Sequence, residues 1–238
     1  MDKFEERVPT GPKSYSQYAS HKKCGFKFAA DKVWRFEVKP QEFGPALIRG
    51  NEVHDSVENF FKGSDLLHPD LTKYKQWMWG LRSGYDCYPE KKWAFKIDRE
   101  TDEWTAVEFD DPEASWRGVF DLLVVPKEAS EGKAIQIKEW KTGRIYDDHK
   151  WQRSLYEAAA TEGYPDYASW DVVTVYFDQK KEPLGGRTVA AASHAENKVA
   201  WRERMDLMDP PATYIPNPGS HCRWCPHSRF KGGKCSVG

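Results

Sequence analysis

Two strand-like segments of the chain carry charged side chains where apolar ones are expected. In "RGVFDLLVVP", apolar residues flank Asp121 on both sides, so both faces of its strand are predicted to be buried. In "IQIKEWKTG", alternate side chains share a face, which places Glu139 and Lys141 in line with Ile135 and Ile137. A buried carboxylate is costly unless it is paired, protonated or bound to a cation. Asp121 and Glu139 are therefore candidates to share a hard divalent ion such as Mg²⁺.

Polar residues near these strands also have spacings that suit a site. Gly118 lies three residues before Asp121, at a point where backbone or substrate can approach closely. Gln152 and Tyr156 are four residues apart on a predicted helix, so they share a face. Each of these signals is weak alone, and their value lies in their combination.

Two less specific interpretations stay open at this point. His54 lies on the same side of a predicted helix as Val57, where it can supply a nitrogen ligand, but such histidines are more often satisfied core residues. Lys141 can form a structural ion pair with Asp121 or Glu139 that carries no chemistry.

The cysteines suggest a second metal site. Cys222 and Cys225 form a C-x-x-C motif, and Cys235 follows in the same Pro/Gly-rich tail. Such a tail has little core of its own, so a metal is expected to supply folding energy. A zinc knuckle would need one more ligand. The spacing leaves three residues open for that role: His221, His227 and Cys24.

Composition bounds the class of protein. The chain has 238 residues, including 11 Trp, 11 Tyr and 12 Phe, enough to exclude disorder and to build a sizeable core. It has no apolar run of about 20 residues and no apolar stretch near its N-terminus. We expect a cytoplasmic protein, of a bacterium, an archaeon or a virus-infected cell, that does not enter a membrane and whose cysteines are free or metal-bound.

The net charge is only −1, but basic residues gather at both ends of the chain. Residues 13–39 hold seven Lys or Arg against two acidic residues, and residues 221–238 hold four Lys or Arg and no acidic residue. The simplest interpretation is two solvated tails. The alternative is a nucleic-acid surface.

The elements that must position these residues alternate between helix and strand periods. Helices are predicted within 14–24, 45–63, 69–84, from Asp147 to about Gly163, and 195–208. Ser14 or Ser16 is the expected cap of the first helix. Strands are predicted over 91–98 and 103–109 as a hairpin, then over 117–126, 134–141, 170–178 and 186–193. This alternation indicates a layered α/β or α+β fold.

The order of the polar residues resembles a known family. His54, Gly118-x-x-Asp121, Glu139-x-Lys141 and Gln152-x-x-x-Tyr156 are similar to the motifs of the PD-(D/E)xK nuclease superfamily, and specifically of its RecB-like exonuclease branch. The resemblance covers about residues 50–160. It implies a restriction-endonuclease-like mixed central β-sheet flanked by helices. We expect residues 1–238 to form a single nuclease domain with its core at about 40–195.

The resemblance also implies roles for the site residues. His54, Asp121, Glu139 and the backbone carbonyl of Trp140 would hold one or two Mg²⁺ or Mn²⁺ ions. Lys141 would position the attacking water or offset developing charge. Gln152 and Tyr156 would brace the site or the DNA backbone, and the product would carry a 5′-phosphate.

The cysteines resemble those of a subset of RecB-like nucleases, which includes AddB-type and CRISPR-adaptation exonucleases. In that subset four cysteines hold a [4Fe-4S] cluster, which implies this role for Cys24, Cys222, Cys225 and Cys235, with Zn²⁺ as the alternative. Cys87 is then structural. The cluster lobe would consist of about 13–35 and 209–238.

Such a lobe would bring the two basic stretches together to grip DNA. Trp224 and Phe230 would be available for base stacking, with at least one of them packed around the cluster. The DNA-binding candidates are Lys22, Lys23, Arg223, Arg229 and Lys231.

The sequence thus predicts a divalent-metal-dependent DNA exonuclease, acting on single strands or frayed ends in recombination, repair or CRISPR-type DNA processing. Homo-oligomers, or protein partners from recombination or CRISPR adaptation, are compatible with it. One alternative is a catalytically inactive iron–sulfur or zinc DNA-binding module of a larger complex. Another is a different metal-dependent phosphoryl-transfer enzyme.

Overall fold

The structure is a computed structural model that describes residues 10–38, 44–127, 134–146, 148–167, 169–178, 186–190, 194–209 and 214–237. No helix in these ranges is both long and apolar enough to cross a membrane. The helices are α1 (Tyr15–Lys23), α2 (Gly25–Phe28), η1 (Ala29–Val33), α3 (Pro45–Phe61), η2 (Pro69–Tyr74), α4 (Lys75–Gly84), α5 (His149–Gly163), α6 (His194–Asp206), η4 (Ser220–Trp224) and η5 (Arg229–Lys231). The strands are β1 (Tyr85–Ile97), β2 (Trp104–Ala106), β3 (Trp116–Pro126), β4 (Ile135–Lys141), β5 (Ser169–Tyr176) and β6 (Gly186–Ala190).

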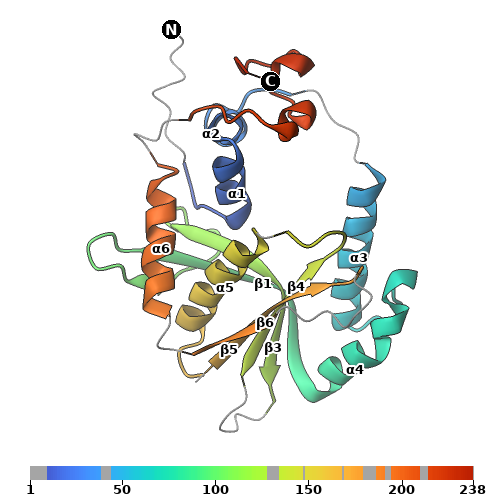
Figure 1. The fold of residues 1–238 in the computed structure, drawn as a ribbon. Coiled ribbons are helices and arrows are strands. Elements are labelled where there is room, and N and C mark those ends of the chain that lie inside the picture. The colour runs from blue at the N-terminus through green and yellow to red at the C-terminus, as the bar shows by residue number, and fades with distance from the viewer. Residues whose placement is uncertain are drawn as a thin grey trace.

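A six-stranded mixed sheet of order β2-β1-β3-β4-β5-β6 forms the centre of the fold (Figure 1). The β4–β5 pair is parallel, and the other strand pairs are antiparallel. Helix α5 makes the crossover between the two parallel strands, as such a connection requires. The predicted mixed α/β fold with a restriction-endonuclease-like sheet is confirmed.

Two apolar clusters cover the two faces of this sheet. Leu155 of α5 and Trp201 of α6 pack with Ile135 and Ile137 on one face. On the other face, helices α3 and α4 pack against Leu122, Val124 and Trp140. Glu139 therefore shares the α5 face with the two isoleucines, whereas Trp140 points to the α3 face, as the strand alternation predicts.

Most predicted elements are present with small shifts at their ends. Ser14 caps α1 and forms a capping box with Gln17, which confirms one of the two predicted caps. The segment predicted as one helix over 69–84 is divided into η2 and α4, and Trp77 of α4 is exposed. Asp147, predicted as the cap of α5, lies outside the described residues.

The ladder between β1 and β3 is interrupted at one position. Pro89 pairs with Leu122 and Lys91 pairs with Phe120, which leaves Glu90 opposite Asp121. Glu90 has a φ of 52°, the left-handed region that residues other than glycine rarely adopt. The irregularity in the β1–β3 pair therefore lies at Asp121, the residue whose carboxylate is unusual in an apolar strand.

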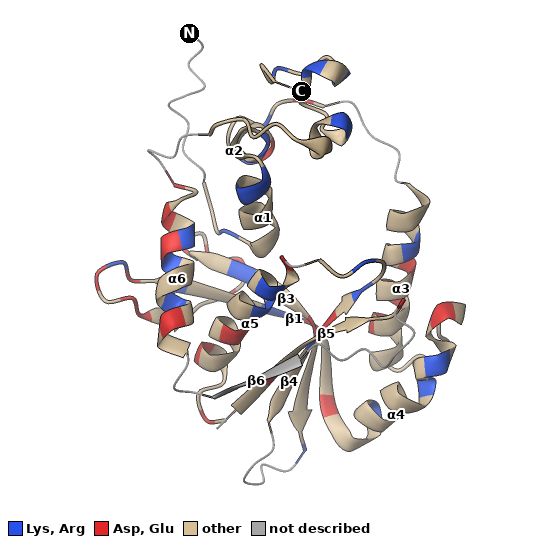
Figure 2. Cartoon of the chain, in the orientation of Figure 1, with Lys and Arg blue, Asp and Glu red and all other residues tan. Residues whose placement is uncertain are grey.

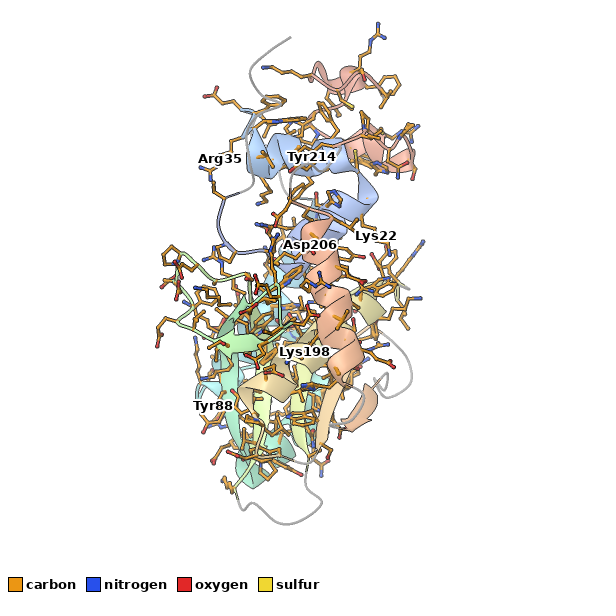
Figure 3. The ribbon with its side chains drawn as sticks, turned by 90° about the vertical axis from the view of Figure 1, so that its left-hand side faces the viewer. Lys22, Arg35, Tyr88, Lys198, Asp206 and Tyr214 are labelled. Carbon is orange, nitrogen blue, oxygen red and sulfur yellow. The ribbon has the colours of Figure 1, made fainter. Side chains whose placement is uncertain are left out.

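The N-terminal helices and the C-terminal tail pack together at one end of the molecule (Figure 1). Tyr214 lies beside this N-terminal segment in Figure 3, and its ring centroid is 5.9 Å from those of both Phe28 and Trp34. His227 is buried, and its Nε2 lies 2.6 Å from Asp31 Oδ1. Aromatic packing and this ion pair thus join the two segments.

Candidate active site

The site forms where β3 and β4 separate. Their register ends at Leu122 and Lys138, just before the positions of Asp121 and Glu139. Beyond that point the backbone N–H of Trp140 donates to Asp121 Oδ2 at 2.7 Å, so the carboxylate takes the place of a ladder acceptor. Strand β4 meanwhile stays paired with β5 as far as Lys141 and Tyr176. The separation opens room beside two acidic side chains without leaving the Trp140 N–H unpaired.

Glu139 is held by two donors on one of its oxygens. Lys141 Nζ lies 2.6 Å and Gln152 Nε2 lies 2.8 Å from Glu139 Oε1. Gln152 Nε2 also donates to the Tyr156 hydroxyl at 3.1 Å, and that hydroxyl donates to the carbonyl of Val119 at 2.9 Å. Glu139 Oε2 is buried and has no hydrogen-bond partner among the described residues. This carboxylate is therefore rigidly placed and retains one unsatisfied oxygen.

The predicted ion pair between Glu139 and Lys141 does exist. Within the described ranges, however, the one basic group near Asp121 at ion-pair distance is His54, whose Nδ1 is 3.8 Å from Asp121 Oδ2. That separation is longer than a hydrogen bond. The side chains of Asp121 and Glu139 are only 14% and 6% exposed, so the site holds more buried acidic oxygens than the lysine can satisfy.

Burial and mutual repulsion set the protonation of the site. Burial, and then the nearby charge of Glu139, raise the pKa of Asp121 well above its usual range. Burial also lowers the pKa of His54, against the opposing influence of Glu139 and of a hydrogen bond with the Trp140 backbone. A low pKa favours the neutral imidazole, which is the form that binds a metal.

An acidic cleft lies over these residues. It has a volume of about 770 Å³, within the roughly 300–1,000 Å³ range of ligand pockets. Figure 2 shows acidic residues on α3, which forms one wall. Asp55, Glu58 and Glu90 line the cleft together with His54 and Asp121. Burial, and then the charges of Glu58 and Glu139, raise the pKa of Glu90. The acidic residues of the cleft thus make it harder for Glu90 to lose its proton.

Ion pairs join helix α3 to the segments beside the site. Arg49 of α3 binds Asp178, with its Nη2 2.5 Å from Oδ1, and its Nε also binds Asp70 at 2.7 Å. Asp178 accepts a hydrogen bond from the backbone N–H of Gly143, at the end of β4. These contacts fix the helix that carries His54 to the loop that follows Lys141.

Two neighbours of Lys141, His149 and Tyr176, were not among the predicted site residues. His149 Nδ1 lies 2.6 Å from the Tyr176 hydroxyl, and the two rings stack with centroids 5.6 Å apart. Tyr176 is the register partner of Lys141 on β5. One signal was present in the sequence: His149 lies three residues before Gln152, on the same face of α5.

The group that lies close to Gly118 is not the one that the sequence led us to expect. Its register partner is Trp93, and a Cβ at this position would lie 2.4 Å from Cζ2 of that indole. The close approach at Gly118 is therefore made by a packed side chain, and not by backbone or substrate. Trp93 in turn packs against Phe120 and Tyr156, next to the site.

Comparison with known proteins decides the family. Residues 12–230 match the family model of the PD-(D/E)XK nuclease superfamily. The chain belongs to this nuclease superfamily. None of the curated proteins compared with it matches the sequence.

Two solved structures are similar to this nuclease at low identity. One is SSO0001, at 13% identity, 81% coverage of this chain and 73% of that chain, with a TM-score of 0.37. The other is a candidate exonuclease of Eubacterium rectale, at 12% identity, 90% and 88% coverage, and a TM-score of 0.48.

PD-(D/E)XK nucleases usually use divalent metal ions such as Mg²⁺ or Mn²⁺, and the residues of this site fit such an ion. Asp121 and Glu139 supply hard oxygen donors, and in the described part of the chain no protein group binds Glu139 Oε2. Within the described ranges, no group of three or more His, Cys, Asp or Glu side chains is assembled to hold a metal. Mg²⁺ retains several waters and takes few protein ligands, so two carboxylates and a backbone carbonyl are a sufficient set.

The expected iron–sulfur cluster of this nuclease is not supported. Cys24 and Cys235 are buried, Cys222 and Cys225 are partly buried, and all four are free thiols. Burial, and then the charges of Cys24, Cys225 and Cys222, raise the pKa of Cys235. The four do not, however, form a metal-binding group among the described residues.

The zinc-knuckle histidine and the aromatic residues of the tail also differ from expectation. His227 is bound to Asp31 through Nε2, and so supplies an N- to C-terminal link that needs no metal. Trp224 is 72% exposed and Phe230 is 81% exposed, so neither packs inside the lobe. Both remain available to stack on bases.

Proposed function

We propose that the chain is a divalent-metal-dependent deoxyribonuclease that hydrolyses phosphodiester bonds and leaves 5′-phosphate ends. The observation that carries this proposal is the pair of buried carboxylates, Asp121 and Glu139, with an unsatisfied oxygen next to Lys141. A purely structural ion pair would have no reason to leave Glu139 Oε2 buried and unpaired.

The carboxylates of Asp121 and Glu139, with the Trp140 carbonyl and His54, would hold Mg²⁺ or Mn²⁺. When bound, the ion supplies Lewis acidity and lowers the pKa of a coordinated water. Lys141 Nζ, 2.6 Å from Glu139 Oε1, orients that water or offsets charge on the phosphate. Gln152 and Tyr156 hold Glu139 in position through their chain of hydrogen bonds to Val119.

His149 is proposed as a further phosphate contact. The Tyr176 side chain is buried, and among the described residues His149 Nδ1 is the hydrogen-bond partner of its hydroxyl. In the proposed arrangement Tyr176 donates to Nδ1, which places the proton of the neutral imidazole on Nε2. The Nε2–H then donates to a phosphate oxygen beside Lys141.

Exonucleolytic action on single strands or frayed ends is the finer part of the proposal. It is supported by the resemblance to RecB-like exonucleases through His54 and the Gln152-x-x-x-Tyr156 motif. The basic candidates Lys22, Lys23, Arg223, Arg229 and Lys231 would contact the strand, and the exposed Trp224 and Phe230 would stack on its bases.

A metal held by Cys24, Cys222, Cys225 and Cys235 is proposed separately from the nuclease site. It is supported by the effect of Cys24, Cys225 and Cys222 in raising the pKa of Cys235, and by backbone N–H groups that donate to two of the sulfurs, Asn217 to Cys24 at 3.5 Å and Gly219 to Cys222 at 3.4 Å. Iron, acid-labile sulfide and zinc analysis of anaerobically purified protein tests it. Absence of all three would refute it without affecting the nuclease proposal.

The direct test of the function is digestion of end-labelled single-stranded DNA with Mn²⁺, Mg²⁺ or EDTA. We expect cleavage with either ion, none with EDTA, and none in Asp121→Asn. The matched control is Asp166→Asn, which changes an exposed aspartate that lies outside the cleft and should retain wild-type activity. Cleavage by Asp121→Asn at the wild-type rate would refute the site.

A further inference from the structure

Three cationic side chains converge on one indole next to the active site. Lys22 Nζ lies 4.7 Å, Lys150 Nζ 5.5 Å and the guanidinium carbon of Arg204 4.5 Å from the ring centroid of Trp151. They come from three helices, α1, α5 and α6, that are distant in the sequence. We refer to Lys22, Lys150, Arg204 and Trp151 as the Trp151 cluster.

The cations of this cluster have no acidic partner among the described residues. Other cations of α6 are paired: Lys198 binds Glu162, and Arg202 binds both Asp102 and Asp206. Arg204, two residues further along α6, forms no such pair in the described part of the chain and lies against aromatic rings instead. Positive charge is thus neutralised along most of the helix and left unneutralised where it meets Trp151.

Packing alone does not explain three cations around one ring. A cation–π contact at an exposed site contributes about 0.5–1 kcal/mol, and one cation is enough to obtain it. Bringing further like charges to the same indole adds mutual repulsion, which a bound anion would relieve. Lys22 and Lys150 are exposed, so the charges are open to a ligand from solution.

The cluster lies next to the cleavage site. Trp151 directly precedes Gln152, which binds Glu139, and Lys150 follows His149, the stacking partner of Tyr176. Figure 2 shows basic residues on α1 and at the start of α5. In Figure 3, Lys22 lies near the end of α6 marked by Asp206. Positive charge therefore continues from Lys141 along the first turn of α5 and away from the acidic cleft.

We propose that the Trp151 cluster binds backbone phosphates of the DNA strand whose end lies in the active site. This inference rests on the proposed function and adds a path for the substrate across α5, α1 and α6. Phosphate binding by lysine and arginine is largely independent of base sequence, as a nuclease without sequence preference requires. The cluster thus holds the strand in register while His149 and Lys141 contact the phosphate to be cut.

The test is the affinity of the full chain for a fluorescent single-stranded 20-mer, measured by anisotropy in Ca²⁺ or EDTA across a series of salt concentrations. Lys22→Ala and Lys150→Ala should each weaken binding roughly two- to fivefold. Each should also lower the slope of log K against log salt by about 0.7, and the double variant by about 1.4, because each phosphate contact releases counterions. The loss should be equal for dT and dA oligomers.

Lys96→Ala is the matched control, because it removes a lysine that is paired with Glu113 on an exposed part of the sheet. It should change neither the affinity nor the slope. Both cluster lysines are exposed, so unchanged melting curves are expected and will exclude misfolding. A wild-type slope in the double variant, or wild-type protein that does not bind DNA, would overturn the inference. If the double variant shows the reduced salt slope but the wild type binds DNA without ever cleaving it, the proposed function would be overturned and the binding surface would be retained.

Discussion

Replacement of Asp121 by asparagine should abolish cleavage and also remove a pH dependence of stability. Asparagine can still accept the Trp140 N–H through its Oδ1, so the hydrogen bond that is 2.7 Å long in the wild type need not be lost. What disappears is the carboxylate whose pKa is raised by burial and by Glu139. The variant therefore separates charge from shape at this position.

The direction of this pH dependence of stability follows from proton linkage. With a raised pKa in the folded state, folded Asp121 binds more protons than the unfolded chain at pH values above the ordinary Asp pKa of about 3.9. Metal-free wild type therefore loses stability as the pH rises toward the raised value, by at most about 1.4 kcal/mol per pH unit. A loss of about 2.7 kcal/mol over two such units lowers the melting temperature by roughly 5–11 °C for a chain of this length.

Thermal unfolding in EDTA, followed by circular dichroism at several pH values, measures this effect. The wild type should melt lower as the pH rises from about 5, and Asp121→Asn should show a flatter profile and a higher melting temperature at alkaline pH. Mg²⁺ at about 100 times its Kd should stabilise the wild type by about 2.7 kcal/mol and leave the variant unchanged. Parallel pH profiles for the two proteins, or an equal response to Mg²⁺, would refute the reasoning.

Three further predictions concern the residues around Glu139. Lys141→Met should lower kcat by roughly 10²–10³-fold while leaving the Mg²⁺-induced rise in melting temperature in place, since the lysine acts on water or phosphate; loss of metal binding would contradict this. Gln152→Ala should weaken Mg²⁺ binding or activity about 10–100-fold, because Glu139 loses one of its two donors, and titration of activity against Mg²⁺ will show it. Tyr176→Phe should raise KM for DNA more than it lowers kcat, because His149 loses its hydroxyl partner; an effect on kcat alone would argue against a phosphate contact.

The positions of the site residues on β3, β4 and α5 could be predicted because each follows from the sequence pattern of a single strand or helix. Strand alternation placed Glu139 and Lys141 on one face, and the apolar surroundings of Asp121 marked it as exceptional. Gln152 and Tyr156 share a helix face, and α5 packs on that side of the sheet. The metal-binding roles of these residues stay predictions, because the structure supplies their positions and not their chemistry.

The remaining features depend on packing that no local pattern encodes. The contact between His149 and Tyr176 requires the parallel register of β4 and β5, and the Trp151 cluster requires three helices to meet. The first half of β1 was missed because "YDCYPE" mixes polar residues with a proline. The tail was expected to depend on a metal because its aromatic partners, such as Phe28 and Trp34, lie at the opposite end of the sequence.

The ion pairs between Arg49, Asp178 and Asp70 have a consequence for how the site responds to salt. Asp121, Glu139, Lys141, Gln152 and Tyr176 belong to the stretch of the chain that runs from β3 to β5. His54 arrives on α3, which is fixed to that stretch by a contact between residues 129 positions apart. Because the ion pairs are partly exposed, salt screens them. Raised ionic strength should therefore weaken the link between the Arg49 end of α3 and the loop after β4, while the apolar packing of α3 on the sheet stays intact.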